Sequence, residues 1–127
     1  MKTHFPVTVY YEDTDAGGIV YHANYLKYAE RARTDFLKTI GLSNQTLLSK
    51  GFGIVVCKVN IEFKRPAFLE DVLEVQTIFP HEGKSNMVIH QDILRNGEVL
   101  VSMDVTVVCV STQTKRPVRI PAILLKK

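Results

Sequence analysis

One helical repeat set among runs of alternating residues limits what this chain can fold into. Between residues 25 and 40, side chains that suit a buried face recur every three or four positions, which is the spacing of one side of a helix. At roughly 3.6 residues per turn, the repeat predicts a helix of about four turns. We expect Asn24 to cap its start and Gly41 to end it. The positions on this face are Tyr25, Leu26, Ala29, Ala32, Arg33, Phe36, Leu37 and Ile40.

The residues on both sides of this helix alternate with the period of two that is typical of strands. Residues 5–11 alternate between apolar and polar or small side chains and predict a first strand. Ser43 is placed to cap a short second helix that ends near Gly51. In residues 54–64 the odd positions predict one apolar strand face, made by Val55, Cys57, Val59, Ile61 and Phe63.

Three further strands are expected at residues 72–79, 87–94 and 99–110, separated by short turn-forming segments. Asn96 and Gly97 predict a tight hairpin, because a type I′ turn needs positive φ at both central residues. Consecutive strands with short connections form antiparallel sheets. The sequence therefore predicts an α+β fold in which one long helix covers one face of about five antiparallel strands.

The 127 residues suit one domain, spanning positions 1–127, with a core large enough to need no disulfide or metal. The second sheet face is expected to carry Thr106, Val108 and Val110 together with Ile54 and Val56. These side chains are too apolar for a face left in water. We therefore expect a homo-oligomer that covers them.

Composition excludes several classes of function. A net charge of +3 is too small for the basic stripe of a nucleic-acid-binding protein. No apolar run approaches the about 18 residues of a membrane-spanning helix, and the first fifteen residues lack the apolar core of an export signal. We expect a cytoplasmic protein. Cys57 and Cys109 lie in apolar runs and are expected to be buried, unpaired thiols.

The segment EDTDAGGIVYHANY, residues 12–25, joins the first strand to the helix and has the composition of a reactive site. Two glycines let the backbone approach a ligand closely, and the helix start that follows offers N–H groups to a developing oxyanion. A carboxylate on this connector can act as nucleophile or as general base. The alternative is that each aspartate only serves a turn. A metal site from Asp13, Asp15 and His22 lacks tight ligand spacing, so we expect neither metal nor cofactor.

The string VYYEDTDAGGIVYHANYLKYAERAR resembles the signature of the 4-hydroxybenzoyl-CoA thioesterase family of hot-dog-fold proteins. It is most similar to the YbgC branch, acyl-CoA thioesterases associated with the Tol–Pal system of Gram-negative bacteria. The resemblance extends through FKRPAFLEDVLEVQT and covers nearly the whole chain. It implies a hot-dog fold, in which the sheet wraps around the long central helix. It also implies a dimer or tetramer with active sites at subunit interfaces.

The resemblance assigns roles to particular residues. Asp15 corresponds to the acidic catalyst, as nucleophile or general base, and the His22 backbone N–H to the group that polarises the carbonyl; the His22 side chain is expected to take part. Two further sets are implied. Substrate positioning falls to Gly18, Tyr21 and Tyr25, and coenzyme A phosphates to Lys84, Arg65, Arg116 and Arg119.

The predicted function is hydrolysis of acyl-CoA to free acid and coenzyme A, in connection with Tol–Pal or phospholipid metabolism. Acyl carrier protein is a further expected partner. Two alternatives remain: a hot-dog dehydratase acting on an acyl carrier protein, and a non-catalytic acyl-carrier or lipid-enzyme docking module. Fold alone does not choose among them, and the acyl group and the choice between dimer and tetramer stay open.

Overall fold

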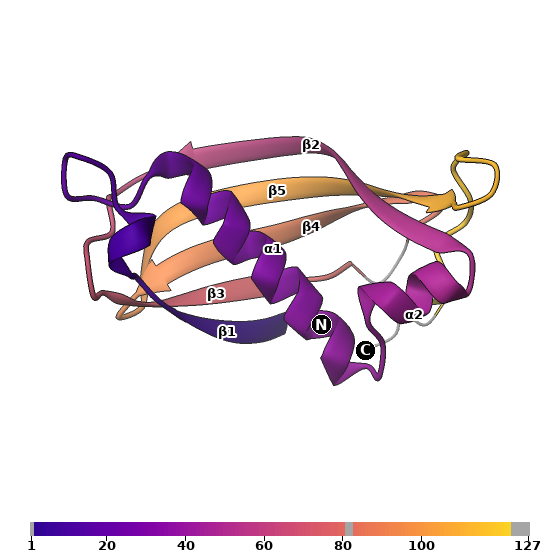
Figure 1. The fold of residues 1–127 in the computed structure, drawn as a ribbon, viewed down its shortest axis with the longest axis horizontal. Helices are drawn as coiled ribbons and strands as arrows, with labels where there is room; N and C mark the ends of the chain where they lie inside the picture. The colour runs from indigo at the N-terminus through magenta and orange to yellow at the C-terminus, as the bar shows by residue number, and fades with distance from the viewer. Residues whose placement is uncertain (1, 81–82, 123–127) are drawn as a thin grey trace.

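The computed structural model describes residues 2–80 and 83–122, and in it a long helix lies across one face of a five-stranded antiparallel sheet (Figure 1). The strands lie in the order β1-β3-β4-β5-β2, so β1 and β2 are the two edges. The expected fold class is confirmed. The elements are β1 Lys2–Thr8, the 3-10 turn η1 Tyr11–Asp13, α1 His22–Thr39, α2 Asn44–Ser49, β2 Phe52–Phe63, β3 Val72–Ile78, β4 Asn86–Arg95 and β5 Glu98–Ser111.

Helix α1 begins two residues before the expected cap and ends as expected. Its N-cap is Tyr21, and Asn24 lies inside the first turn, so the prediction that Asn24 caps the helix was wrong. Asn24 is instead buried, where its side chain donates to Asp13. At the other end Gly41 has φ of +76°. The N–H of Leu42 reaches the Leu37 carbonyl at 2.8 Å, which closes the helix in the expected left-handed manner.

The buried face of α1 differs in part from the predicted one. Leu26 is 41% exposed, whereas Tyr28, absent from the predicted face, is fully buried. The helix packs on β1, β3 and β4 rather than on β2, and this offset turns Tyr28 toward the core. The helix contacts β2 near its start, where the ring centroids of Tyr25 and Phe63 lie 5.8 Å apart, and the inward row of β2 is partly exposed.

A buried polar contact fastens α1 to the sheet. Gln91 of β4 is fully buried, and its Nε2 donates to the Ala29 carbonyl and to Thr77 Oγ1, each at 3.0 Å. Its Oε1 accepts from Arg33 at 2.9 Å. Burial of the guanidinium lowers the pKa of Arg33 from its ordinary value. Because a buried amide is costly unless it is hydrogen-bonded, these contacts define how α1 is rotated on the sheet.

A bulge in β2 breaks the predicted alternation. The pairing with β5 skips one residue between Val56 and Lys58, so Cys57 is the extra residue. Before the bulge Ile54 and Val56 pair with buried residues of β5, and after it Val59, Ile61 and Phe63 do so. The prediction was therefore wrong for Val55, which pairs with Val108 on the outer face, and for Ile54 and Val56, which face inward. Cys57 is exposed rather than buried, while Cys109 is buried as expected.

The first strand was also displaced. β1 starts at Lys2 and ends at Thr8, and the chain then enters η1, where the Asp13 N–H donates to the Tyr10 carbonyl at 2.9 Å. Tyr11 is consequently 82% exposed and not part of a strand face. The predicted later strands and the hairpin are confirmed, with φ of +51° at Asn96 and +81° at Gly97. Within the described ranges, no helix is long and apolar enough to cross a membrane.

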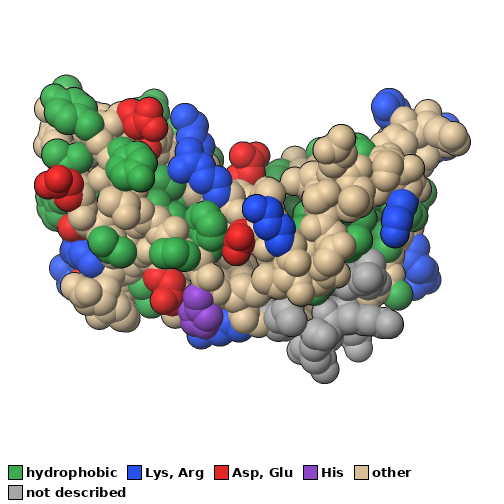
Figure 2. All heavy atoms as spheres, turned by 60° about the horizontal axis from the view of Figure 1, so that its bottom comes forward, with side chains coloured by type: hydrophobic (Ala, Val, Ile, Leu, Met, Phe, Trp, Pro, Cys, Tyr) green, Lys and Arg blue, Asp and Glu red, His purple; other side chains and the backbone are tan. Residues whose placement is uncertain are grey.

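Hydrophobic side chains gather at the end of the domain that holds the connector between β1 and α1 (Figure 2). Two segments meet there through hydrogen bonds of Val9 to Asp71 and of Glu70 to Val9. The exposed apolar side chains that they carry are Tyr10, Tyr11, Phe68, Leu69 and Val72.

A histidine bridges two carboxylates on the outer face of the sheet. The Nδ1 atom of His90 lies 2.8 Å from Asp104 Oδ1, and its Nε2 atom lies 3.0 Å from Asp92 Oδ1. Ser102 also donates to Asp92, at 2.7 Å. The bond to Asp104, followed by the charge of Asp92, raises the pKa of His90 against an opposing effect of burial.

The His90 bridge predicts a pH-dependent stability. Because the pKa of His90 is higher in the folded protein, its stabilising effect is complete below about pH 6.5 and is lost as the pH rises through the folded value. The melting temperature of the wild type, minus that of H90N, should shrink by about 2 °C between pH 5.5 and pH 8.5. When both proteins also carry D104N, this difference in melting temperature should change less with pH. A difference that grows with pH would contradict the assignment.

Candidate active site

The connector between β1 and α1 folds back on itself as a tight loop. The Asp15 N–H donates to the Ile19 carbonyl at 2.9 Å, and the Gly18 N–H donates to the Asp15 carbonyl at 3.0 Å. A bridge between Thr14 and Val20 closes the loop. Gly18 has φ of +83°, a conformation that glycine adopts without strain, so its first role is to make this turn. The loop ends directly at the start of α1.

Asp15 lies at the root of this loop with an exposed side chain. One carboxylate oxygen, Oδ1, accepts the Gly17 N–H at 2.8 Å. The other oxygen has no hydrogen-bond partner among the described residues. Asp15 therefore serves the turn, as the alternative interpretation held, and still presents one oxygen for chemistry.

His22 is the first residue of α1, where the resemblance predicted a carbonyl-polarising N–H. A first-turn N–H has no acceptor within its own helix, and within the described residues no other group accepts that of His22. The helix dipole adds positive potential at this point. The imidazole is flanked by aromatic rings, with centroids 4.5 Å from Tyr21 and 6.4 Å from Phe63. An oxyanion placed here would meet an available donor.

An apolar depression opens beside His22. It is bounded on one side by the connector and on the other by the segment that follows β2, and these are joined by the Val20 N–H bond to Ala67 and the Ile19–Phe68 bridge. Phe63 is 50% exposed and forms part of its wall. Asp15, Gly18 and Tyr21 are outside the lining. The lining residues are Ile19, Val20, His22, Tyr25, Phe63, Lys64, Arg65 and Pro66.

Tyr25 lines this depression, but its hydroxyl is engaged in structure. It accepts the N–H of the buried Ala67 at 3.1 Å, and burial raises the pKa of Tyr25. The residues predicted to position the substrate therefore do not all lie in this depression. Tyr25 and His22 share a depression, Gly18 shapes the loop, and the Tyr21 ring packs on the His22 imidazole.

The sequence prediction considered Asp13 only as a turn residue or a metal ligand, and its bond to Asn24 was not foreseen. Its side chain is only 5% exposed and accepts from Asn24 Nδ2 and from the Tyr10 N–H, each at 2.9 Å. The signal that was available is its spacing of eleven residues from Asn24, across a connector that had to turn back. Both oxygens are occupied, so Asp13 is not placed to act as a base.

The predicted phosphate-binding residues lie in two separate places. Arg65 lies beside His22 and pairs with Glu98, Nε to Oε2, at 2.8 Å. Lys84 is at the opposite end of the sheet, where its carbonyl accepts from Ile120. Arg116 and Arg119 accompany it, since the 116–120 segment runs beside Cys109 and Ser111 of β5. From Val101, the partner of Phe63, to Cys109 is eight residues, or roughly 27 Å along the strand.

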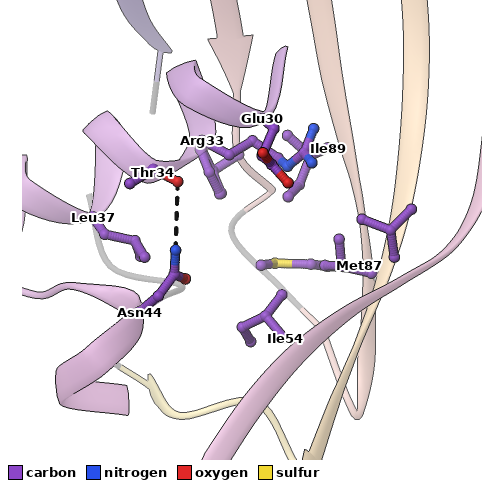
Figure 3. Close-up of a pocket in the computed structure, with 11 residues that line it drawn as sticks. Glu30, Arg33, Thr34, Leu37, Asn44, Ile54, Met87 and Ile89 are labelled. Carbon is purple, nitrogen blue, oxygen red and sulfur yellow. Dashed lines mark hydrogen bonds between the residues drawn. The ribbon is translucent and has the colours of Figure 1, made fainter. Parts of the chain in front are cut away.

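A second depression lies at that far end, between α1, α2 and the sheet (Figure 3). Its volume is about 140 Å³. Figure 3 shows Glu30 and Arg33 reaching it from α1, opposite Met87 and Ile54, while Asn44 donates to Thr34 at 3.4 Å. The remaining lining residues are apolar: Leu37, Val56, Phe79, Ile89 and Val107. No group of three or more potential metal ligands occurs among the described residues.

Residues 9–127 match the family described as the Thioesterase-like superfamily. The chain belongs to this superfamily. It is 42% identical to the acyl-CoA thioester hydrolase YbgC of Escherichia coli O6:H1 over 118 residues, covering 92% of this chain and 88% of that protein. It is also 42% identical to the acyl-CoA thioesterase YbgC of Haemophilus influenzae, covering 92% and 87%.

Solved structures of the superfamily share this architecture. A probable thioesterase from Bartonella henselae is 33% identical, with a TM-score of 0.87 over 95% of this chain and 100% of that one. The expected hot-dog fold and the similarity to YbgC are both confirmed.

The Tyr25 contact predicts a structural effect. Y25F removes the acceptor of a buried N–H and should lower the free energy of unfolding by about 1–2 kcal/mol, measured by urea denaturation. Y21F is the matched control, because the Tyr21 ring is exposed, and it should leave stability unchanged. If Y25F instead abolished turnover at full stability, the hydroxyl would belong to substrate binding.

Proposed function

We propose that this chain hydrolyses the thioester of acyl-CoA to a free acid and coenzyme A. The observation that carries the proposal is the His22 N–H at the start of α1, which has no acceptor among the described residues and follows Asp15 by seven residues on one short connector. The activities named for the YbgC relatives support it. In the non-catalytic alternative, neither the available carboxylate oxygen nor the available donor has a purpose.

The reaction can use these groups in two ways. Asp15 either attacks the thioester carbon to give an anhydride that water then opens, or takes a proton from the water that attacks. In both routes the carbonyl oxygen gains charge and accepts a hydrogen bond from the His22 N–H. The tetrahedral species then collapses, the carbon–sulfur bond breaks, and the thiolate of coenzyme A takes up a proton. In this proposal the His22 imidazole orients water or relays that proton.

The complete site requires a second copy of the chain. β2 is an edge strand of twelve residues, and its inward row is partly exposed because α1 leaves it uncovered. A long, apolar, unpaired edge is a template for pairing with another strand. Antiparallel pairing of two β2 strands about a two-fold axis would place the Phe63 end of one beside the Phe52 end of the other. A dimer built on this edge, alone or doubled to a tetramer, would cover it.

Such a dimer would bring the basic residues of one chain close to the connector of the other. Lys84, Arg116 and Arg119 lie at the Phe52 end of the domain, so in the dimer they would approach His22 of the partner chain. Cationic side chains there suit the phosphates of coenzyme A. The second depression, of about 140 Å³, lies at the same end, and its apolar side chains suit the acyl group. We assign substrate binding to this shared interface.

We further propose that the protein works in the cytoplasm, in connection with Tol–Pal or phospholipid metabolism, on acyl-CoA and also on acyl carrier protein. The resemblance to the YbgC branch supports this setting. The unpaired thiols of Cys57, which is exposed, and of Cys109 suit a reducing compartment.

Asp15→Asn tests the chemical role directly. The amide can still accept from Gly17 and keep the turn, but it cannot serve as nucleophile or base, so kcat should fall by about 10²-fold or more. Thiol release from a panel of acyl-CoAs measures it. H22A should be intermediate, since it keeps the backbone N–H and removes only the imidazole.

The matched control for Asp15→Asn is E12Q, which changes an exposed carboxylate three residues away. It should retain wild-type turnover. Near-normal turnover in D15N together with loss in E12Q would show that the wrong carboxylate was chosen.

Mixed dimers test the shared site. D15N retains the basic end, whereas a K84A/R116A/R119A variant retains Asp15 and should show a raised KM with less change in kcat. When the two are co-expressed, about a quarter of all sites should be intact, because half of randomly paired two-fold dimers are mixed and each holds one complete site. Activity at low substrate should therefore exceed that of either parent. No gain over the parents, or a fully active monomer by light scattering, would refute the interface.

A further inference from the structure

Asp13 holds a carboxylate that is buried without a charged partner. Its side chain is 5% exposed, and none of the ion pairs between described residues includes it. Removing a carboxylate from water is expensive unless neutral donors replace the lost solvent. The surroundings of Asp13 should therefore be built to supply such donors.

The donors come from the connector and from α1. The Tyr10 N–H reaches Oδ2 at 2.9 Å, and the Asn24 side chain reaches Oδ1 at 2.9 Å from the first turn of the helix. The backbone of Asp13 continues the pattern, since its carbonyl accepts the Tyr21 N–H at 2.9 Å. One residue thus binds both sides of His22, at Tyr21 and at Asn24.

A third polar group, the hydroxyl of Tyr28 on α1, faces the same carboxylate. The Tyr28 hydroxyl is buried one turn beyond Asn24 and has no hydrogen-bond partner of ordinary geometry among the described residues. Burial, followed by the neighbouring Asp13 carboxylate, raises the pKa of Tyr28. The hydroxyl therefore stays protonated and presents a dipole that favours the charge of Asp13.

We propose that Asp13 is a positioning residue that holds the His22 N–H in register with Asp15. This role rests on the proposed function. Asp15 follows Asp13 by two residues, and the bonds of Asp13 fasten the residues on each side of His22. A displacement of about 1 Å between a catalytic group and its partner can cost 10²-fold in rate. Asp13 itself does not contact the reacting atoms, because both of its oxygens are occupied.

The carboxylate of Asp13 and the amide of Asn24 can be exchanged between the two positions. The double variant then keeps both groups and their hydrogen bond, whereas each single variant loses one group. N24D sets two carboxylates against each other at hydrogen-bond distance, so it should lower kcat more than about tenfold while leaving KM within about twofold. D13N leaves the Tyr10 N–H and the Asn24 amide competing for one acceptor and should lower kcat by a smaller factor. In D13N/N24D the amide and the carboxylate exchange places, and kcat should recover to within about threefold of wild type.

The pH profile distinguishes positioning from a loss of folding. In N24D the two carboxylates can share a proton in acid, as paired aspartates do, and the shared proton restores the hydrogen bond. The ratio of its kcat to the wild-type kcat should therefore rise as the pH falls from 8 toward 5. Melting temperatures, measured in parallel, identify folded variants, and E12Q is the matched control that should follow wild type at every pH.

Each outcome decides the matter. Low kcat in N24D with recovery in D13N/N24D supports the positioning role. Full kcat in folded N24D and D13N, with D15N inactive, overturns that role and leaves the proposed function standing. A folded double variant no better than N24D also overturns it. Absence of thiol release by the wild type from every acyl-CoA tested would overturn the proposed function, and the positioning role with it.

Discussion

The contact between α1 and the sheet is the constraint on which the other features depend. Gln91 lies within this contact, and its buried amide is satisfied only when the Ala29 carbonyl and Arg33 face β4. This requirement limits both the rotation of α1 about its axis and its position along the sheet. His22 therefore begins the helix beside Phe63, and the donor at the helix start is directed by packing that lies two turns away.

The same packing leaves a depression at each end of the domain. Because α1 rests on β1, β3 and β4, the inward row of β2 is left partly open along its length. At one end this opening exposes Phe63 next to the connector, and at the other it exposes Val56 above the second depression. Strand order makes β2 an edge, and the offset of a single helix leaves the inward row of that edge strand partly exposed.

Much of the fold could be predicted from the sequence, since periodicity is a local property. The spacing of the apolar residues predicted α1, β3, β4 and β5, and Asn96-Gly97 predicted its hairpin for a conformational reason. The motif placed His22 at a helix start. What failed depends on contacts between distant residues. The local sequence predicted Asn24 as a cap, whereas its side chain bonds to Asp13 eleven residues earlier. No local pattern shows that Lys84 lies far from His22 within one chain.

The bulge at Cys57 has a consequence for how β2 can vary. One extra residue inverts the parity of the strand, so even-numbered positions face inward before it and odd-numbered positions after it. The two halves of β2 therefore alternate with opposite parity in the sequence, yet their core-facing side chains lie on the same face of the sheet. Deleting Cys57, the residue between Val56 and Lys58, would remove the bulge, make the alternation continuous and keep every other side chain of β2 on its present face. Deleting a residue elsewhere in β2, with the bulge kept, would instead exchange the solvent-facing and core-facing side chains on one side of the deletion.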